Sequence, residues 1–137
     1  MQADFVRCRV AVLVSALMVL AGCGENVEPA IGTVTLDGQP LPDAFLTFVP
    51  RGEQGSPGFA KTDSAGHYEM VRGSNDSGLI PGEYEVRITT YVEGKPDAVP
   101  PIPETPERVP ARYNLNTELR VSVSENSEPF NFDLKSE

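Results

Sequence analysis

Three residues that could take part in nucleophilic catalysis lie close together, namely Asp63, Ser64 and His67. A serine, a histidine and an aspartate supply the nucleophile, the base and the orienting group of many acyl-transfer enzymes. Here they flank a predicted turn at 65–66, and a tight turn lacks the depth and orienting contacts that such a triad needs. The chain also has no G-x-S-x-G motif. His67 is the only histidine, so we expect an exposed strand residue and a protein that is not an enzyme.

Metal ligands are sparse in this chain. One His and two Cys are too few for a closed zinc site, which takes about four such ligands. Calcium needs about six to eight oxygens, and the best candidates are Asp76 and, if the two loops meet, Asp63. No EF-hand pattern accompanies them, and an ordinary Asx turn is the simpler interpretation of Asp76. We therefore predict no metal site and no cofactor.

The first 22 residues are typical of a signal peptide. Residues 1–10 carry two Arg against one Asp, and residues 10–20 are apolar except for one Ser. A helix of that apolar length covers only about 16 Å, roughly half of the hydrocarbon core of a bilayer. The segment is therefore too short to span a membrane. A basic stretch, a short apolar stretch and small residues, in that order, predict export.

Leu20, Ala21, Gly22 and Cys23 directly follow the apolar stretch and resemble the bacterial lipobox. The resemblance implies that a diacylglycerol thioether forms on Cys23, that a peptidase cleaves before it, and that acyl chains such as palmitate anchor the mature protein. More than one acyl chain gives stable membrane attachment. The alternative is an ordinary signal peptide cleaved near Ala21, with Cys23 left as a free thiol. Cys8 lies in the removed segment, so no intramolecular disulfide is expected.

These features divide the chain into three parts. Residues 1–22 form the signal peptide, residues 23–29 the lipidated Cys with a short tether, and residues 30–135 a single domain. A second domain would fall below the usual size range. The polar tether 24–29 spans at most about 20 Å when extended. The folded body is therefore expected to stay near a membrane of the bacterial cell envelope, on its periplasmic or outer face.

Side chains follow a period of two in six stretches, at 30–38, 43–50, 67–71, 82–91, 117–125 and 129–134, with an apolar and a polar side in each except 43–50, where both sides are partly apolar. This period is typical of half-buried strands. The clearest case places Tyr84, Val86 and Ile88 on one side of 82–91. Turn residues such as Asp37-Gly38 separate the stretches, and no long segment carries the apolar stripe of a helix. We predict an all-β fold, an antiparallel β-sandwich of about seven strands.

Three motifs add a resemblance to this pattern. They are a strand with a D-G turn and a P-L-P-x-A corner at 32–44, a T-D-x-x-G-x-Y hairpin at 62–68, and a P-G-x-Y-x-V strand entry at 81–86. Their order resembles that in carboxypeptidase regulatory-like domains, which have a transthyretin-like (prealbumin-like) sandwich. With the lipobox and a closing F-x-F-D-L strand, the chain resembles small bacterial lipoproteins. The resemblance implies a binding or structural module without peptidase activity, because this domain is the accessory part of carboxypeptidases and carries no zinc ligands.

Residues 93–110 form a long proline-rich segment between two predicted strands, with six prolines in 18 residues. Proline fixes φ and removes a hydrogen-bond donor. We expect a stiff connection that crosses between the sheets, with polyproline II backbone lying over the surface. The alternative is that its P-x-x-P spacings dock in an aromatic groove of a partner.

Charge and aromatic content bear on the partner. The chain has 11 basic and 20 acidic residues and lacks the clustered Lys and Arg that nucleic acids require. Trp is absent, and Phe45, Tyr91 and Phe59 are the aromatic residues outside the predicted inward set. We predict a non-enzymatic, lipid-anchored envelope protein acting as a structural or partner-binding module, with an unknown envelope protein as partner. The alternative is a carbohydrate-binding envelope module, in which Phe45 and Tyr91 contact a polysaccharide.

Overall fold

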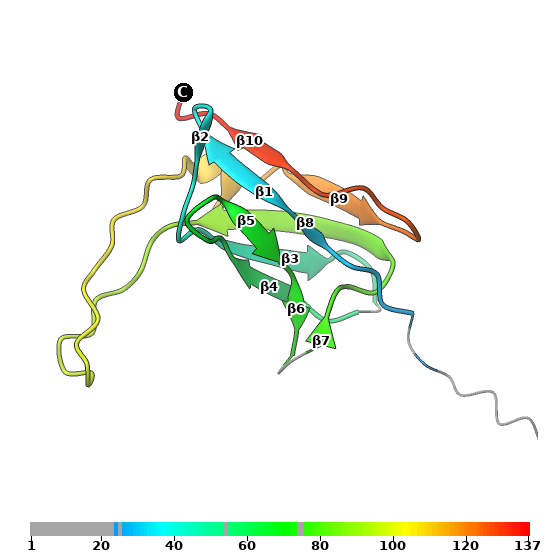
Figure 1. The fold of residues 1–137 in the computed structure, drawn as a ribbon, viewed down its shortest axis with the longest axis horizontal. Coiled ribbons are helices and arrows are strands. Elements are labelled where there is room, and N and C mark those ends of the chain that lie inside the picture. Colours follow the sequence, from blue (N-terminus) through cyan, green and yellow to red (C-terminus); the bar gives the residue numbers. More distant parts are fainter. Residues whose placement is uncertain (1–23, 25, 54, 74–75) are drawn as a thin grey trace, which may run out of the picture.

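The computed structural model describes residues 24, 26–53, 55–73 and 76–137 (Figure 1). The predicted signal peptide and the lipobox residues Leu20, Ala21, Gly22 and Cys23 lie outside the described residues. The elements are β1 (Ile31–Leu36), β2 (Gln39–Pro40), β3 (Phe45–Pro50), β4 (Gly58–Lys61), β5 (His67–Glu69), β6 (Val71–Arg72), β7 (Asp76–Ser77), β8 (Gly82–Thr89), the 3₁₀ helix η1 (Ala111–Tyr113), β9 (Arg120–Val123) and β10 (Phe132–Leu134). No helix in this part of the chain has the length and apolar character needed to cross a membrane.

The strands form two sheets that pack on each other (Figure 1). The small sheet has the order β10-β1-β2, with β5 also paired to β1, and the large sheet has the order β7-β6-β4-β3-β8-β9. Side chains from both sheets are buried in one hydrophobic cluster, among them Val34, Leu46, Phe48, Tyr68, Tyr84, Val86, Ile88, Val123 and Leu134. The predicted all-β sandwich is confirmed at this level, and so is the inward set predicted for β8.

Phe48 lies at the centre of the core and is fully buried. Its ring centroid is 6.4 Å from that of Tyr68, 6.3 Å from that of Tyr84, and 6.1 Å from those of both Phe130 and Phe132. These are the tilted and edge-on contacts that aromatic pairs prefer. The Tyr68 hydroxyl donates to the Phe130 carbonyl at 2.5 Å. Burial of Tyr68 raises the pKa of its phenol, so this donor keeps its proton.

One strand of the small sheet departs from the predicted antiparallel arrangement, whereas β2 and β5 pair antiparallel with β1 as predicted. β10 runs parallel to β1, with Val34 opposite Phe132 and Leu36 opposite Leu134. The predicted count of about seven strands is also too low for the described residues, because β2, β6 and β7 have two residues each. The physical reason is that side chains alternate with a period of two in parallel and antiparallel strands alike. The sequence pattern thus indicates a strand without its direction, and a two-residue strand shows no pattern.

The proline-rich segment does not cross between the sheets, which corrects that expectation. β8 and β9, the strands on either side of it, are neighbours in the large sheet. The segment instead folds back on itself, with isolated bridges between Val92 and Thr105 and between Lys95 and Ile102. It extends away from the body as a long arm (Figure 1, yellow-green to yellow). We call residues 91–106 the arm.

The chain joins the body shortly before β1. The Glu28 amide donates to the Leu79 carbonyl, and the Leu79 amide donates to the Glu28 carbonyl, both at 2.8 Å. Residues 24–27 therefore precede the first backbone pairing, and four residues span at most about 14 Å. The chain enters at one end of the body, and the arm leaves from the other end (Figure 1).

Candidate functional site

The outer face of the large sheet carries aromatic side chains. In the sheet register, Phe59 lies between Val71 and Thr47, and Phe45 lies between Lys61 and Thr89. Their exposed fractions are 51% for Phe59 and 37% for Phe45. Tyr91, two residues beyond Thr89, is 49% exposed. Apolar groups gathered on an exposed sheet face are typical of a binding surface. The site is built around them, and we call this surface the outer face.

Phe45 is partly covered by a neighbouring charge. The Lys61 Nζ atom lies 5.4 Å from the Phe45 ring centroid and pairs with an Asp43 carboxylate oxygen at 2.8 Å. A cation at this distance from an aromatic ring is held by the ring's electron-rich face. One side of the Phe45 ring is therefore occupied within the molecule, which leaves less of it for a ligand.

Tyr91 lines a cavity of about 410 Å³ at the base of the arm, which we call the Tyr91 pocket. Its lining comes from the outer face, from the arm with the residue after it, and from the segment after η1. The residues are, in that order, Thr47, Arg87 and Thr89, then Tyr91 and Glu107, then Asn114 and Leu115. The volume is within the range of about 300–1,000 Å³ for small-molecule sites. The fold thus brings residue 47, residues 87–91 and residues 107–115 together at one pocket.

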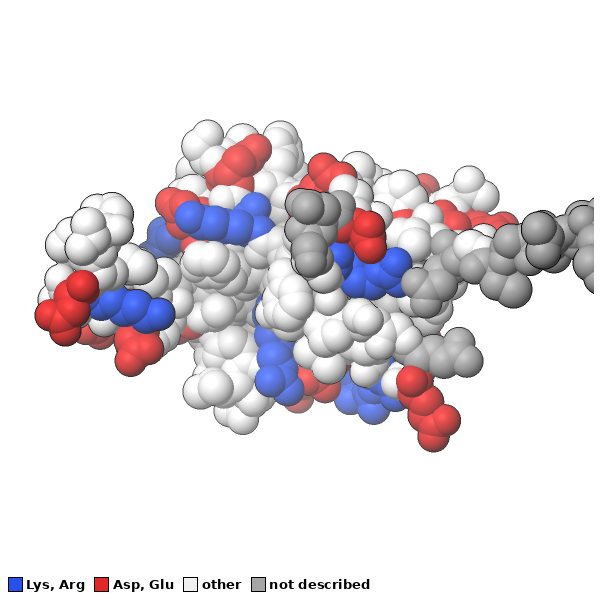
Figure 2. All heavy atoms as spheres, turned by 90° about the horizontal axis from the view of Figure 1, so that it is seen from below, with Lys and Arg blue, Asp and Glu red and all other residues white. Residues whose placement is uncertain are grey.

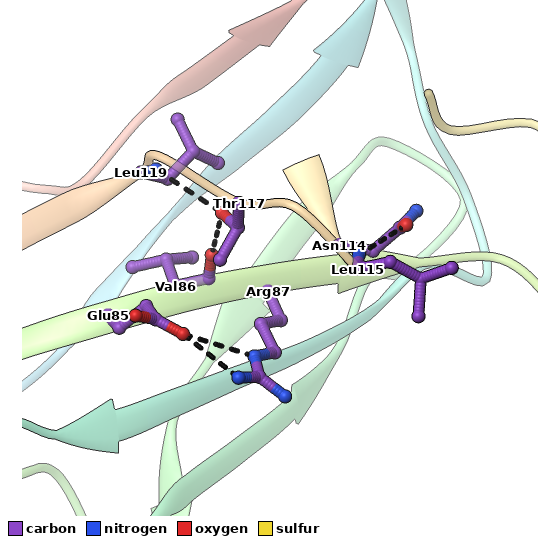
Figure 3. A network of polar contacts seen from close by, with 7 residues as sticks. All are labelled: Glu85, Val86, Arg87, Asn114, Leu115, Thr117 and Leu119. Atoms are coloured by element: carbon purple, nitrogen blue, oxygen red, sulfur yellow. Dashed lines mark hydrogen bonds and ion pairs between the residues drawn. The ribbon is translucent and has the colours of Figure 1, made fainter. Parts of the chain in front are cut away.

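Arg87 is the cation of the Tyr91 pocket. Its Nε and Nη2 atoms both donate to Glu85 Oε1, at 3.2 and 3.0 Å, and Figure 3 shows this pair lying along β8. The Arg87 side chain is 55% exposed and that of Glu85 is 27% exposed. Within the described residues, Arg87 Nη1 and the hydroxyls of Thr47 and Tyr91 make no hydrogen bond. These three groups are available to a ligand.

Glu107 holds the base of the arm. Its Oε1 atom accepts hydrogen bonds from the Thr90 amide at 2.8 Å, the Thr90 hydroxyl at 2.9 Å and the Val109 amide at 3.0 Å. Its Oε2 atom accepts one from the Thr89 hydroxyl. Burial raises the pKa of Glu107, but these hydrogen bonds together outweigh it and hold that pKa below its ordinary value. The carboxylate is therefore ionised at neutral pH.

Leu115 stands out from the body because the backbone around it is fixed. The Leu115 amide donates to Asn114 Oδ1 at 2.6 Å, and Asn114 Nδ2 donates to the Val109 carbonyl at 3.1 Å. Thr117 anchors the next residues, since its hydroxyl donates to the Val86 carbonyl at 2.5 Å (Figure 3). Leu115 is 87% exposed. A leucine held outward in this way offers an apolar contact at the rim of the Tyr91 pocket.

A second, larger cavity of about 730 Å³ lies over the small sheet and contains His67 and Asp63. Asp63 Oδ1 accepts hydrogen bonds from the backbone amides of Ala65 and His67, each at 2.9 Å. The amide of His67 is the main cause of the lowered pKa of Asp63. The other oxygen, Oδ2, is 3.9 Å from His67 Nδ1, too far for a hydrogen bond. Asp63 therefore shapes its turn and does not orient the histidine.

The predicted calcium candidates have separate partners. Asp63 is engaged in its own turn, and Asp76 lies 4.0 Å from Arg72. Across residues 24, 26–53, 55–73 and 76–137, no three His, Cys, Asp or Glu side chains come together in a way that could hold a metal ion. On the face seen in Figure 2, Lys and Arg are interspersed with Asp and Glu rather than gathered into a basic patch.

The two predicted contact residues, Phe45 and Tyr91, lie on the same face of the large sheet, but only Tyr91 lines the pocket. Sequence reasoning missed Arg87, which falls on the other side of 82–91 from the predicted inward residues, and Leu115, which lies in no alternating stretch. A lone leucine between two asparagines was the available signal. No protein-family model matches the chain, and no match was found among the curated proteins or the solved structures. The resemblance to carboxypeptidase regulatory-like domains stays a prediction.

Proposed function

We propose that this protein is a lipid-anchored, non-enzymatic module of the bacterial cell envelope that binds its partner through the outer face. The observation that carries the proposal is the exposure of three aromatic side chains, Phe45, Phe59 and Tyr91, around one sheet face. A transthyretin-like domain of the carboxypeptidase regulatory-like type is part of this proposal. It is supported by the two packed sheets and by the order of the sequence motifs.

The anchor is supported by the sequence and by the way the chain enters the body. Leu20 to Cys23 match a lipobox directly after an apolar stretch. Only residues 24–27 separate Cys23 from the pairing of Glu28 with Leu79, which corresponds to at most about 14 Å. A diacylated Cys23 holds this end of the sandwich at the membrane. The arm then points away from the membrane, because it leaves from the opposite end (Figure 1).

The proposal of a non-enzymatic role rests on His67 and Glu107, the two residues considered as a general base. His67 is not oriented by Asp63, since its Nδ1 atom lies 3.9 Å from Asp63 Oδ2. The carboxylate of Glu107 is already satisfied by four hydrogen bonds. A general base needs a free lone pair near the proton that it takes. Both groups therefore act as structural elements in this proposal.

Acylation of Cys23 is tested by metabolic labelling of cells with a fatty acid. Cys23→Ala should abolish the label and leave the precursor uncleaved, because the thiol is the attachment point. Cys8→Ala is the matched control and should change the labelling of the mature protein little, since this residue lies in the removed segment. A labelled Cys23→Ala protein would overturn the anchor.

The binding face is tested with a photo-crosslinking amino acid placed at Phe59 on the outer face or at Glu69 on the small sheet, in the full-length protein in cells. Both positions are exposed, so a difference in crosslinking yield reflects which sheet faces the partner and not how accessible the probe is. Crosslinks from position 59 should exceed those from position 69 by at least about tenfold and disappear with Cys23→Ala. Equal yields at the two positions would contradict a partner on the outer face.

A further inference from the structure

We propose that the Tyr91 pocket binds a pyranose unit of a neutral polysaccharide. The inference rests on the proposed function, because it names the ligand class of the same face. It starts from the shape and chemistry of the pocket, in which an aromatic ring, an exposed leucine and unpaired polar atoms surround a volume of about 410 Å³. That volume accommodates one or two sugar rings.

The apolar part of the pocket fits one side of a sugar ring. Tyr91 is 49% exposed and Leu115 is 87% exposed, and both line the cavity. A pyranose presents C–H groups on the faces of its ring and hydroxyls around its edge. The C–H groups pack against an aromatic ring because the face of that ring carries partial negative charge. Tyr91 therefore provides the stacking surface, and Leu115 extends it at the rim.

The polar part of the pocket fits the edge of a sugar ring. Arg87 Nη1 and the hydroxyls of Thr47 and Tyr91 make no hydrogen bond within the described residues. Sugar hydroxyls both donate and accept, so they can satisfy an arginine N–H as well as the two hydroxyl groups. Glu85 holds Arg87 in place for this role, because its Oε1 atom accepts hydrogen bonds from Arg87 Nε and Nη2 at 3.2 and 3.0 Å.

The charges around the pocket favour a neutral sugar over an acidic one. Arg87 and Glu107, the two charged residues that line the pocket, contribute one charge of each sign, so the pocket has no net positive charge to hold an acidic sugar. The lowered pKa of Glu107 keeps its charge in place at neutral pH. The whole chain has a net charge of −9. A uronic acid would be repelled by the overall charge, whereas a neutral hexose meets no such cost.

The pocket opens onto more of the same face, which favours a polymer. Thr89 lines the pocket and lies opposite Phe45 in the sheet register. Phe59 follows on the next strand, opposite Thr47, which also lines the pocket. A sugar chain that leaves the Tyr91 pocket across the strands therefore meets further exposed aromatic groups. A single free sugar would use only the pocket itself.

The test is affinity electrophoresis of the full-length lipidated protein in detergent, with soluble dextran, mannan, xylan or polygalacturonate in the gel. We expect at least one of the neutral polysaccharides to retard the protein and polygalacturonate to leave it unretarded. Tyr91→Ala should weaken this retardation about tenfold, because the stacking surface is lost. Tyr91→Phe keeps the ring, and its affinity for the polysaccharide should stay within about threefold of that of the original protein.

Arginine variants provide a matched pair. Arg87→Gln should weaken binding of the neutral polysaccharide about three- to tenfold. Arg51→Gln removes an equally charged and exposed side chain from the segment after β3, outside the pocket, and should leave binding unchanged. Equal effects of the two substitutions would mean that net charge rather than the pocket governs retardation, and this would overturn the proposal.

Three further outcomes overturn the inference. They are retardation by polygalacturonate in place of the neutral polysaccharides, retardation by none of the three neutral probes, and unchanged retardation of Tyr91→Ala. The crosslinking experiment separates these from a failure of the proposed function. Crosslinks that persist at position 59 without any binding of polysaccharide would reject the ligand class and keep the outer face as a binding surface.

Discussion

Phe45 and Phe48 lie on the same strand and have opposite surroundings. Phe48 faces the small sheet, is fully buried and contacts four aromatic rings. Phe45 faces outward, is 37% exposed and contacts Lys61. The same comparison holds for the two faces of the whole large sheet. The inner face stabilises the fold by burying apolar surface, whereas the outer face leaves apolar side chains partly exposed.

The comparison is tested first where the expected effect is largest. Phe48→Ala should lower the free energy of unfolding by about 3–5 kcal/mol, because it removes a buried ring and leaves a cavity between the sheets. Chemical denaturation measures this value. A loss below about 1 kcal/mol would mean that the two sheets do not depend on this contact. Phe48→Leu, which keeps much of the volume, should be clearly less destabilising.

A smaller effect is expected at the hydrogen bond that joins β5 to the segment before β10. Tyr68→Phe removes the hydroxyl that donates to the Phe130 carbonyl at 2.5 Å and keeps the ring. We expect a loss of about 1–3 kcal/mol, because the carbonyl loses its partner in a partly buried place. Denaturation of this variant checks the value. An unchanged stability would indicate that water replaces the hydroxyl there.

Glu107 belongs neither to the buried core nor wholly to the exposed outer face, since its carboxylate fixes the arm and the residue also lines the pocket. Its folded pKa is lowered, so its contribution to stability is present above the unfolded pKa of about 4.3 and is lost as the pH falls through the folded pKa. Glu107→Gln should lower the free energy of unfolding by about 1 kcal/mol at pH 7. The substitution should also make stability less dependent on pH below about pH 5. Equal pH profiles of the two proteins would contradict this role.

The sequence predicted the inner face well, and the reason is physical. Burial of one face forces a period of two on the side chains, so the inward positions of Tyr84, Val86 and Ile88 could be read from the chain. The Asp37-Gly38 turn was equally predictable, because both residues adopt a positive φ, 52° and 80°, as a two-residue hairpin turn requires.

The outer site was predictable only in part. Phe45 and Tyr91 were identified because they fall outside the inward set. Arg87 and Leu115 were missed because their position depends on contacts between segments, such as the bond from Thr117 to the Val86 carbonyl. No local pattern encodes such a contact. The direction of β10 and the folding back of the arm were missed for the same reason, since both depend on backbone pairing between distant residues.

The smallest effect on stability is expected at Phe59, and this prediction distinguishes the two faces most directly. Phe59 is 51% exposed and lies on the outer side of β4, so Phe59→Ala removes little buried surface. We expect the free energy of unfolding to change by no more than about 0.5 kcal/mol, against about 3–5 kcal/mol for Phe48→Ala. Denaturation measures both changes under one set of conditions. If Phe59→Ala were as destabilising as Phe48→Ala, the outer face would be part of the folded core. A small change at Phe59 would mean that the exposed ring is available for a partner, as the proposed binding role of the outer face requires.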